Sequence, residues 1–175
     1  MSKYKKIVLA GLLLGTLIVA SRFLSVKTPI VVISFSFVPI MLSAVILGPK
    51  WSALIAGLGD LIGALLFPFG PYFVGYTISA ALTGFIYGLF LYKKEEQEIS
   101  DEKFLFKIII SSVIVLTFIT IGLTTIWVYI TSGKAISIII PTRATTALIM
   151  LPVQVMIMYV LEKALRKPID KFLRD

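Results

Sequence analysis

The sequence predicts an all-α membrane protein, a bundle of six transmembrane helices with an extended lid loop between the first two. Hydrophobic residues make up 58% of its 175 residues, and the mean hydropathy is +1.01, whereas soluble domains are about 45–50% apolar. Long apolar segments follow one another, with most charged residues between them. The lid is predicted by residues 33–37, where Ile and Phe alternate with Ser. The length fits a single domain, residues 1–175.

The first helix is expected over the uncharged residues 7–21, after a Lys-rich start at residues 1–6. Such a start also describes a signal peptide. The apolar run continues into further membrane segments, which favours a transmembrane helix. Gly11 and Gly15 lie one turn apart on it, so they share a face on which another helix can pack closely.

Residues 22–38 are expected to be extended, because Arg22, Lys27 and Pro29 interrupt the helical pattern. Extended backbone exposed to lipid does not occur at membrane depth. We therefore expect this segment to cover a cavity or lie at the outer surface, as a lid. Residues 39–48 form a short apolar piece that ends in a tight turn.

Residues 51–72 read as an apolar helix that carries one acid, Asp60, near its middle and ends in a turn at 68–71. A charge at membrane depth costs several kcal/mol unless it faces a partner or a wet cavity. Asp60 is therefore expected to face a polar pocket, and a purely structural Asp bonded to backbone donors is the alternative. The same helix is rich in small residues, namely Ala53, Ala56, Gly57, Gly59, Gly63 and Ala64.

The rest of the chain is expected to form three more helices and two polar segments. In order, these are a helix at 74–92, a polar linker at 93–107, a helix at 108–133, a helix at 138–161 interrupted near its start by Pro141 and Arg143, and a basic amphipathic tail at 163–175.

The distribution of Lys and Arg predicts the orientation of this bundle. Thirteen of these residues fall in the amino-terminal segment, near residue 50, in the linker and in the tail. Four fall on the other side, and these are Arg22, Lys27, Lys134 and Arg143. The positive-inside rule therefore places both termini in the cytoplasm of a multi-pass cell-membrane protein.

Those four cations, Asp60 and several aromatic residues are expected near the outer mouth of the bundle, which suits a flat, anionic small molecule. Arg binds carboxylates through two hydrogen bonds, and aromatic rings stack on flat heterocycles. The alternative is an interfacial aromatic belt with snorkelling Lys and Arg, and an Asp60–Arg143 ion pair would be purely structural.

Enzymatic activity is not expected from this sequence. It has neither histidine nor cysteine, so it lacks the commonest general base and any thiolate metal ligand. It has no phosphate loop of the GxxxxGK[ST] type, so energy for transport would come from a partner. No basic patch accompanies a nucleic-acid-binding fold, and no cofactor is expected.

A set of short motifs spread over nearly the whole chain resembles one membrane protein family. The motifs are Ser-Arg-Phe-Leu-Ser at 21–25, Lys-Thr-Pro at 27–29, Phe-Val-Pro at 37–39, Leu-Gly-Pro at 47–49, Gly-Asp-Leu-Ile-Gly-Ala-Leu-Leu-Phe-Pro at 59–68, Thr-Thr-Ile-Trp at 124–127, Arg143, and Leu-Pro-Val-Gln at 151–154. They resemble the S component of an energy-coupling factor (ECF) vitamin transporter, most closely the folate-specific S component. Pantothenate-type S components look similar, so another vitamin is the alternative, and a membrane interaction protein without a ligand is a second one.

The resemblance implies six helices with an outward-facing vitamin pocket, and docking on one membrane T subunit and two cytoplasmic ATPases. It also implies that the subunit topples in the membrane to deliver its vitamin. The family's small-residue motif on the first helix is usually Ala-xxx-Ala, and Gly11 and Gly15 stand in its place as the expected docking residues.

Folate as the ligand would fit these residues. Its glutamate would suit a cation, its pterin would suit Asp60, and its rings would stack on aromatic side chains. The expected substrate-binding residues are Arg22, Lys27, Asp60, Phe67, Tyr72, Tyr76, Trp127, Arg143 and Gln154.

Overall fold

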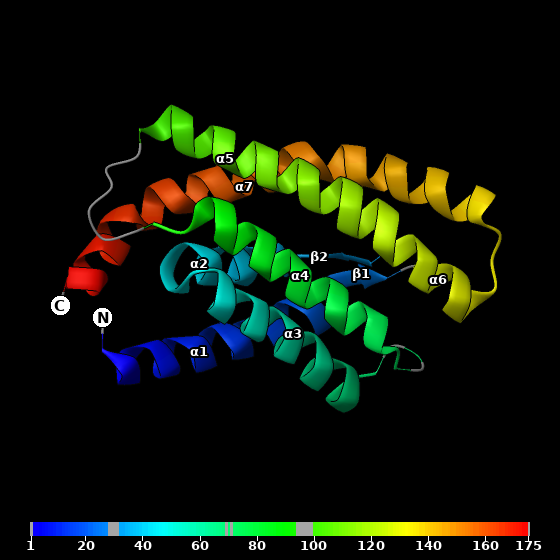
Figure 1. The fold of residues 1–175 in the computed structure, drawn as a ribbon, viewed down its shortest axis with the longest axis horizontal. Coiled ribbons are helices and arrows are strands. Elements are labelled where there is room, and N and C mark those ends of the chain that lie inside the picture. Colours follow the sequence, from blue (N-terminus) through cyan, green and yellow to red (C-terminus); the bar gives the residue numbers. More distant parts are fainter. Residues whose placement is uncertain (1, 28–31, 69, 71, 94–99, 175) are drawn as a thin grey trace.

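The chain folds into a helical bundle with one short β-hairpin (Figure 1). The structure, a computed structural model, describes residues 2–27, 32–68, 70, 72–93 and 100–174. Its elements are α1 (Lys3–Arg22), β1 (Ser25–Lys27), β2 (Val32–Ser34), α2 (Phe37–Leu47), α3 (Pro49–Leu66), α4 (Val74–Leu91), α5 (Asp101–Ile114), the π-helix η1 (Val115–Leu123), α6 (Thr124–Ser132) and α7 (Ile136–Arg174). Since α5, η1 and α6 run on without a break, the described elements amount to six helices, as the sequence predicts.

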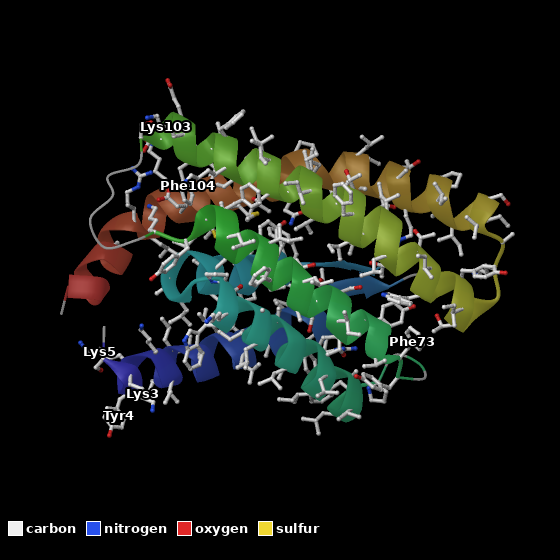
Figure 2. All side chains as sticks on the ribbon, in the orientation of Figure 1. Lys3, Tyr4, Lys5, Phe73, Lys103 and Phe104 are labelled. Atoms are coloured by element: carbon white, nitrogen blue, oxygen red, sulfur yellow. The ribbon has the colours of Figure 1, made fainter. Side chains whose placement is uncertain are left out.

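The helices form two groups that enclose the hairpin (Figure 1). Helices α1 to α4 make one group, and the long helix α5–η1–α6 makes the other with α7. Helix α1 begins and α7 ends at the same end of the bundle. Lys3, Lys5 and Lys103 lie at that end and Phe73 at the opposite one (Figure 2).

Helices α3 and α4 pack with their backbones in direct contact. A Cβ atom on Gly84 would collide with the main-chain carbonyl of Ser52, and one on Gly88 would collide with the main chain of Pro49. Small residues permit this close approach in lipid, where van der Waals packing drives helix association. The small residues 84 and 88 on α4 are therefore used inside the bundle.

Helix α1 buries one face and exposes another. Ala10, Leu13 and Leu17 are buried against the bundle. Gly11 and Gly15 are exposed, and a Cβ on either would meet no atom within 4 Å. The two glycines therefore do not pack the bundle's own core.

The predicted extended segment between α1 and α2 contains an antiparallel hairpin. Ser25 pairs in register with Ser34, and Lys27 pairs with Val32. Residues 28–31, which connect the two strands, lie outside the described residues. The extended conformation is confirmed for the strands. It is wrong at both ends of the expected range, because Arg22 still belongs to α1 and Phe37 begins α2. Closure over a ligand stays a prediction.

Three expectations about helix boundaries are wrong. Residues 101–107 begin α5 rather than ending a polar linker, and Asp101 and Glu102 in the first turn suit the positive end of the helix dipole. Residues 163–174 continue α7 instead of forming a separate tail. Pro141 interrupts no helix, because α7 runs through it. Neighbouring hydroxyls bond main-chain carbonyls there, Thr142 to Ile138 at 2.8 Å and Thr145 to Pro141 at 2.9 Å, as membrane helices that contain Pro allow.

Four of the described helical segments are long and apolar enough to cross a membrane. They are Lys3–Arg22, Val74–Leu91, Asp101–Ser132 and Ile136–Arg166, and Phe37–Leu47 is a shorter apolar helix. Helix α3, which carries Lys50 and Asp60, is not among the four.

An ion cluster around the buried Glu162 joins α5 and α7 to the segment that follows α4. Glu162 is 1% exposed, forms an ion pair with Lys93, and accepts from Arg166 at 2.9 and 3.0 Å. Arg166 also donates to Asp101 at 2.5 Å. Lys93 lies over the ring of Phe104 at 4.8 Å. These contacts hold α5, α7 and the segment that follows α4 together.

Candidate ligand cavity

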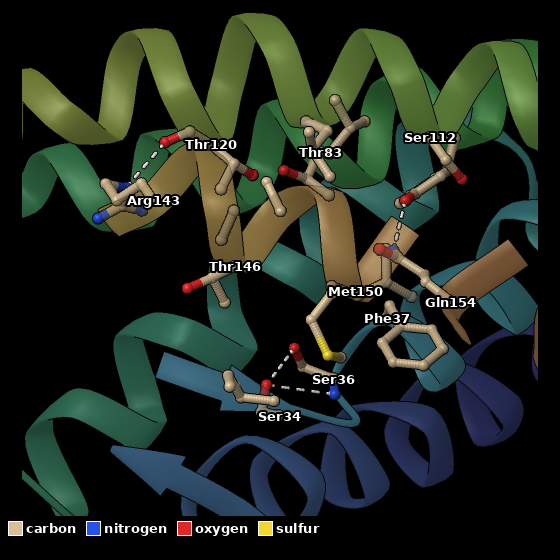
Figure 3. A pocket seen from close by; sticks show the side chains of 17 residues that line it. Ser34, Ser36, Phe37, Thr83, Ser112, Thr120, Arg143, Thr146, Met150 and Gln154 are labelled. Carbon is tan, nitrogen blue, oxygen red and sulfur yellow. Dashed lines mark hydrogen bonds between the residues drawn. The ribbon is translucent and has the colours of Figure 1, made fainter. Parts of the chain in front are cut away.

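A cavity of about 290 Å³ lies between the hairpin, α2, α4, α5–η1 and α7 (Figure 3). Its volume is close to the lower end of the range for small-molecule sites. It is lined by Ile33, Ser34, Ser36, Phe37, Ile40, Ala80, Thr83, Tyr87, Ser112, Val115, Leu116, Thr120, Arg143, Thr146, Ala147, Met150 and Gln154. An apolar slot with a few convergent polar groups is typical of a site for an organic ligand.

One end of the cavity carries a cation. Arg143 is the only charged side chain among the described residues that line the cavity. Its Nε donates to the main-chain carbonyl of Thr120 at 3.1 Å (Figure 3), which ties α7 to η1. The guanidinium is thus held by the backbone of a π-helix, a helix type that occurs often at functional sites.

The π-helix shifts the register of the helix along the cavity wall. Each of its turns accommodates one residue more than an α-turn, since it bonds residue i to i+5. The hydroxyl of Thr124 donates to the carbonyl of Ile119, five residues earlier, at 2.6 Å. This wider winding decides which of the residues between 115 and 123 face α7, and Val115, Leu116 and Thr120 line the cavity.

The other end of the cavity carries neutral polar groups. Gln154 donates through Nε2 to the hydroxyl oxygen of Tyr87 at 2.8 Å, and Ser112 lies beside them in the lining. Tyr87 is 0% exposed. We call Tyr87, Ser112 and Gln154 the polar floor. Eleven residues separate Arg143 from Gln154 on α7, so the cation and the floor are about 16 Å apart along the helix axis.

The hairpin and the start of α2 form one wall. The hydroxyls of Ser34 and Ser36 are hydrogen-bonded at 2.7 Å and lie on the cavity side, and Phe37 and Ile40 continue the wall. Phe37 and Ile40 also belong to the buried core, so this wall is anchored to the bundle through α2.

Of the nine substrate-binding residues expected from the sequence, Arg143 and Gln154 line the cavity. Lys27 is the last residue of β1, and its side chain lies outside what the structure describes. For all nine residues, a direct contact with a ligand stays a prediction.

Asp60 pairs with a different residue from the one considered above. Its Oδ1 lies 3.4 Å from Nη2 of Arg22, which also donates to the main-chain carbonyl of Asp60 at 3.1 Å. Its Oδ2 accepts from Thr77 at 2.8 Å. The Asp60–Arg143 ion pair is therefore wrong, because Arg22 stands beside Asp60 and Arg143 lies along the cavity. The donors to the carboxylate are thus side chains of α1 and α4, not the backbone donors of the structural alternative.

The expected aromatic residues pack next to the ends of α3, α4 and α6, outside the described lining. Phe67 contacts Phe23 edge to face, with ring centroids 5.0 Å apart. The hydroxyl of Tyr72 bonds Thr77, that of Tyr76 bonds Thr131, and Trp127 donates to Ser79. The two tyrosines and the tryptophan therefore have polar partners within the chain.

Sequence reasoning missed Tyr87, Ser112 and Thr120, all within apolar segments. Each has a polar side chain and lines the cavity, and the main-chain carbonyl of Thr120 also accepts from Arg143. Ser and Thr are common at helix contacts in membranes, so their presence in an apolar run identified no particular site. The i to i+11 relation of Arg143 and Gln154 places those two residues on one face of a single helix, but it does not point to residues of α4, α5 or η1.

Comparisons with known proteins agree with one another on the family. A family profile described as the S component of an ECF-type riboflavin transporter matches residues 1–167. The chain is 33% identical over 159 residues to a protein of Clostridium novyi (strain NT) named folate transporter FolT, covering 91% of this chain and 88% of that protein. It is 35% identical over 163 residues to a protein of the same name from Leuconostoc mesenteroides, covering 90% and 84%. A crystal structure titled as FolT bound with folic acid superposes with a TM-score of 0.82 at 34% identity, covering 91% of this chain and 93% of that one.

Proposed function

This chain belongs to the family of S components of ECF-type transporters, and from that premise we propose that it is the folate-binding S component of an ATP-driven ECF importer. The observation that carries the proposal is the cavity between the hairpin, α4, η1 and α7, with one guanidinium at one end and neutral hydrogen-bonding groups at the other. Folate has the same division, with an anionic glutamate at one end and a neutral pterin at the other.

The choice of vitamin is the point on which the comparisons differ. The family profile names riboflavin, whereas both relatives and the solved structure name folate. Riboflavin is uncharged along its ribityl chain and ring, so it offers no carboxylate to Arg143. Folate does, and Arg binds carboxylates through charge-assisted hydrogen bonds. Pantothenate also has a carboxylate, but it lacks the flat ring that would reach a floor about 16 Å away.

We assign the two ends of the ligand accordingly. The glutamate carboxylate binds Arg143, and the donors and acceptors along the pterin edge bind the polar floor of Tyr87, Ser112 and Gln154. Ser34 and Ser36 face the middle of the ligand from the hairpin. Apolar side chains lie between the two ends of the cavity, and a hydrogen bond is worth more where water competes less.

The partner of this subunit is the T subunit of an ECF module with two ATPases, and Gly11 and Gly15 form the docking face. The chain has two glycine pairs spaced four residues apart, and the difference in their surroundings supports this assignment. Gly84 and Gly88 are covered by the main chain of α3, whereas Gly11 and Gly15 meet nothing within 4 Å in the described chain. A small-residue face left open on a membrane helix suits close contact with another helix.

The orientation follows from the charges. Both termini are cytoplasmic, because thirteen of the seventeen Lys and Arg residues fall on that side. Lys3, Lys5 and Lys103 lie at the end of the bundle where the termini meet (Figure 2). The hairpin and Arg143 are then on the outer side, where folate is captured, and toppling on the T subunit delivers it to the cytoplasm.

Isothermal calorimetry on the purified chain tests the choice of ligand, with folate, riboflavin and pantothenate titrated under the same conditions. We expect saturable binding of folate and none of the other two at equal concentrations. Binding of riboflavin or pantothenate in preference to folate would overturn the vitamin assignment. Binding of none of the three would favour an interaction protein.

A further inference from the structure

The outer end of α1 is fastened to α3 by successive contacts. A Cβ atom on Gly59 would lie 2.5 Å from Cδ2 of Leu17, and one on Gly63 would lie 2.7 Å from Nε of Arg22. These glycines therefore let both side chains lie directly on the backbone of α3. The side chain of Arg22 is 8% exposed in this position.

Asp60 extends this attachment to α4. It receives Arg22 on one carboxylate oxygen and Thr77 on the other, at 3.4 and 2.8 Å, and Arg22 also bonds its main-chain carbonyl. We call Arg22, Asp60 and Thr77 the clamp. Its members come from α1, α3 and α4, and none of them lines the cavity.

Arg22, the member of the clamp on α1, lies three residues before β1, and the partner strand β2 belongs to the cavity wall. Ser25 opens β1 and pairs in register with Ser34 of β2, and Ser34 faces the cavity. At the same end of the hairpin, β2 leads into α2, whose first residue, Phe37, is buried in the core. The hairpin is thus attached at two points, and the clamp lies at the first of them.

We infer that Arg22 and Asp60 are positioning residues for vitamin capture, which hold the hairpin against the cavity and thereby set how fast the ligand leaves. The inference rests on the proposed folate binding. Loss of the clamp would free the base of β1, so the hairpin would have to be ordered again each time a ligand binds. That cost lowers affinity through faster dissociation, without removing any contact to the ligand.

The test combines two measurements on the full chain in detergent. Dissociation of radiolabelled folate is followed by chase with unlabelled folate in the wild type, Arg22→Met, Asp60→Asn and the double variant. Movement of the hairpin is followed by the maleimide reactivity of the thiol introduced by Ser25→Cys, because Oγ of Ser25 is shielded from solvent and has no hydrogen-bond partner among the described residues. The chain has no native cysteine, and Ser132→Cys, at an exposed position, is the control.

We expect Arg22→Met to speed dissociation about tenfold, which corresponds to about 1.4 kcal/mol. With folate bound, the reactivity of the thiol at position 25 should rise by a similar factor, and that of the thiol at position 132 should stay unchanged. Asp60→Asn should have a smaller effect in the same direction, and the double variant should equal Arg22→Met, because residues in one network are not additive. Arg22→Lys keeps the charge beside Asp60, so its dissociation rate should lie between those of the wild type and Arg22→Met. This variant can be used in place of Arg22→Met if Arg22→Met folds poorly.

Two results would overturn the inference. In the first, every clamp variant has a folate dissociation rate and a reactivity of the thiol at position 25 within twofold of those of the protein with the native clamp. This result would show that the clamp does not position the hairpin. Faster dissociation with the thiol at position 25 still protected would show that Arg22 contacts the ligand directly. Failure of the wild type to bind folate would instead refute the proposed function. The clamp would still be tested in the ligand-free protein, by comparing the maleimide reactivity of the thiol at position 25 with and without the clamp substitutions.

Discussion

Arg143 on α7 donates through Nε to the main-chain carbonyl of Thr120 on η1, at 3.1 Å. A backbone carbonyl that holds one nitrogen of the guanidinium fixes the plane in which the rest of the group lies, so the side chain is preorganised for a planar anion.

Arg143→Ala is expected to weaken folate binding by about 1–3 kcal/mol, the usual worth of a charge-assisted hydrogen bond. Arg143→Lys should recover only part of the loss, because an ammonium group cannot form two parallel bonds to a carboxylate. Calorimetry on the purified variants measures both. Unchanged affinity in well-folded Arg143→Ala would remove Arg143 from the site.

Gln154→Leu is expected to weaken folate binding by about 1–3 kcal/mol, since both the amide and its partner, the hydroxyl of Tyr87, would lose hydrogen bonds in a buried place. Met150→Leu, at a cavity position without a nitrogen or oxygen in its side chain, is the matched control, and conservative apolar exchanges usually cost under about 1.5 kcal/mol. Equal effects of the two changes on the measured affinity would speak against a polar floor.

Gly11→Leu and Gly15→Leu are expected to leave folate affinity nearly unchanged, yet to abolish ATP-dependent uptake and release the T subunit in pull-downs. A Cβ atom at either position would meet no atom of the described chain within 4 Å, so the bundle leaves room there, whereas the larger side chain would hold the partner helix away. Gly84→Leu is the matched contrast, because its side chain would collide with the backbone of Ser52, and it should reduce the yield of folded protein. Uptake that survives leucine at both positions 11 and 15 would show that docking occurs elsewhere.

Single cysteines test the orientation, since the chain has none of its own. Ser100→Cys should resist an impermeant thiol reagent in intact cells, whereas Ser132→Cys should react, because the excess of Lys and Arg places residue 100 in the cytoplasm. The opposite labelling pattern would place Arg143 and the hairpin on the inner side and contradict the capture of folate from outside.

Glu162→Gln is expected to lower the stability of the bundle by about 3 kcal/mol, because Lys93 and Arg166 would keep their charges without the buried carboxylate between them. Glu102→Gln, an exposed acid at the same end of the bundle, should change little. Thermal unfolding in detergent compares the two. Equal unfolding midpoints would mean that the cluster contributes little net stability.

The helices themselves were predictable, because long apolar runs in this chain have few alternatives to spanning a bilayer. An extended segment after the first helix was also predictable, but the alternation of Ile33, Phe35 and Phe37 with serines was a poor guide to its extent, because β2 ends at Ser34 and Phe37 begins α2. The π-helix was not, because η1 has the same apolar composition as the α-helical segments on either side of it. Pro141 misled the prediction, since the hydroxyls that support α7 around it belong to the folded helix.

The site was predictable in kind and only partly in detail. A single acid in an apolar helix, such as Asp60, indicates that a polar or charged partner lies near it. Four outer cations could fill that role, and the sequence alone does not say which of them pairs with Asp60. Arg22 proved to be the one, 38 positions away, because Gly63 leaves room for its guanidinium. Tyr87 and Ser112 gave no signal, since single polar residues in membrane helices also serve packing.

The pairing of Arg22 with Asp60 has a consequence for how the chain is made. Helix α3 is the one long helix between α1 and α4 that falls outside the apolar membrane spans, and it carries Asp60. An Asp near the centre of a nascent helix opposes its partition from the translocon by about 2.5–3.5 kcal/mol. Arg22 is synthesised before Asp60 and Thr77 after it, so the cation partner of Asp60 is present when α3 is made. Insertion of α3 is therefore expected to be favoured when α1 is already in the membrane, since α1 supplies the cation that neutralises Asp60.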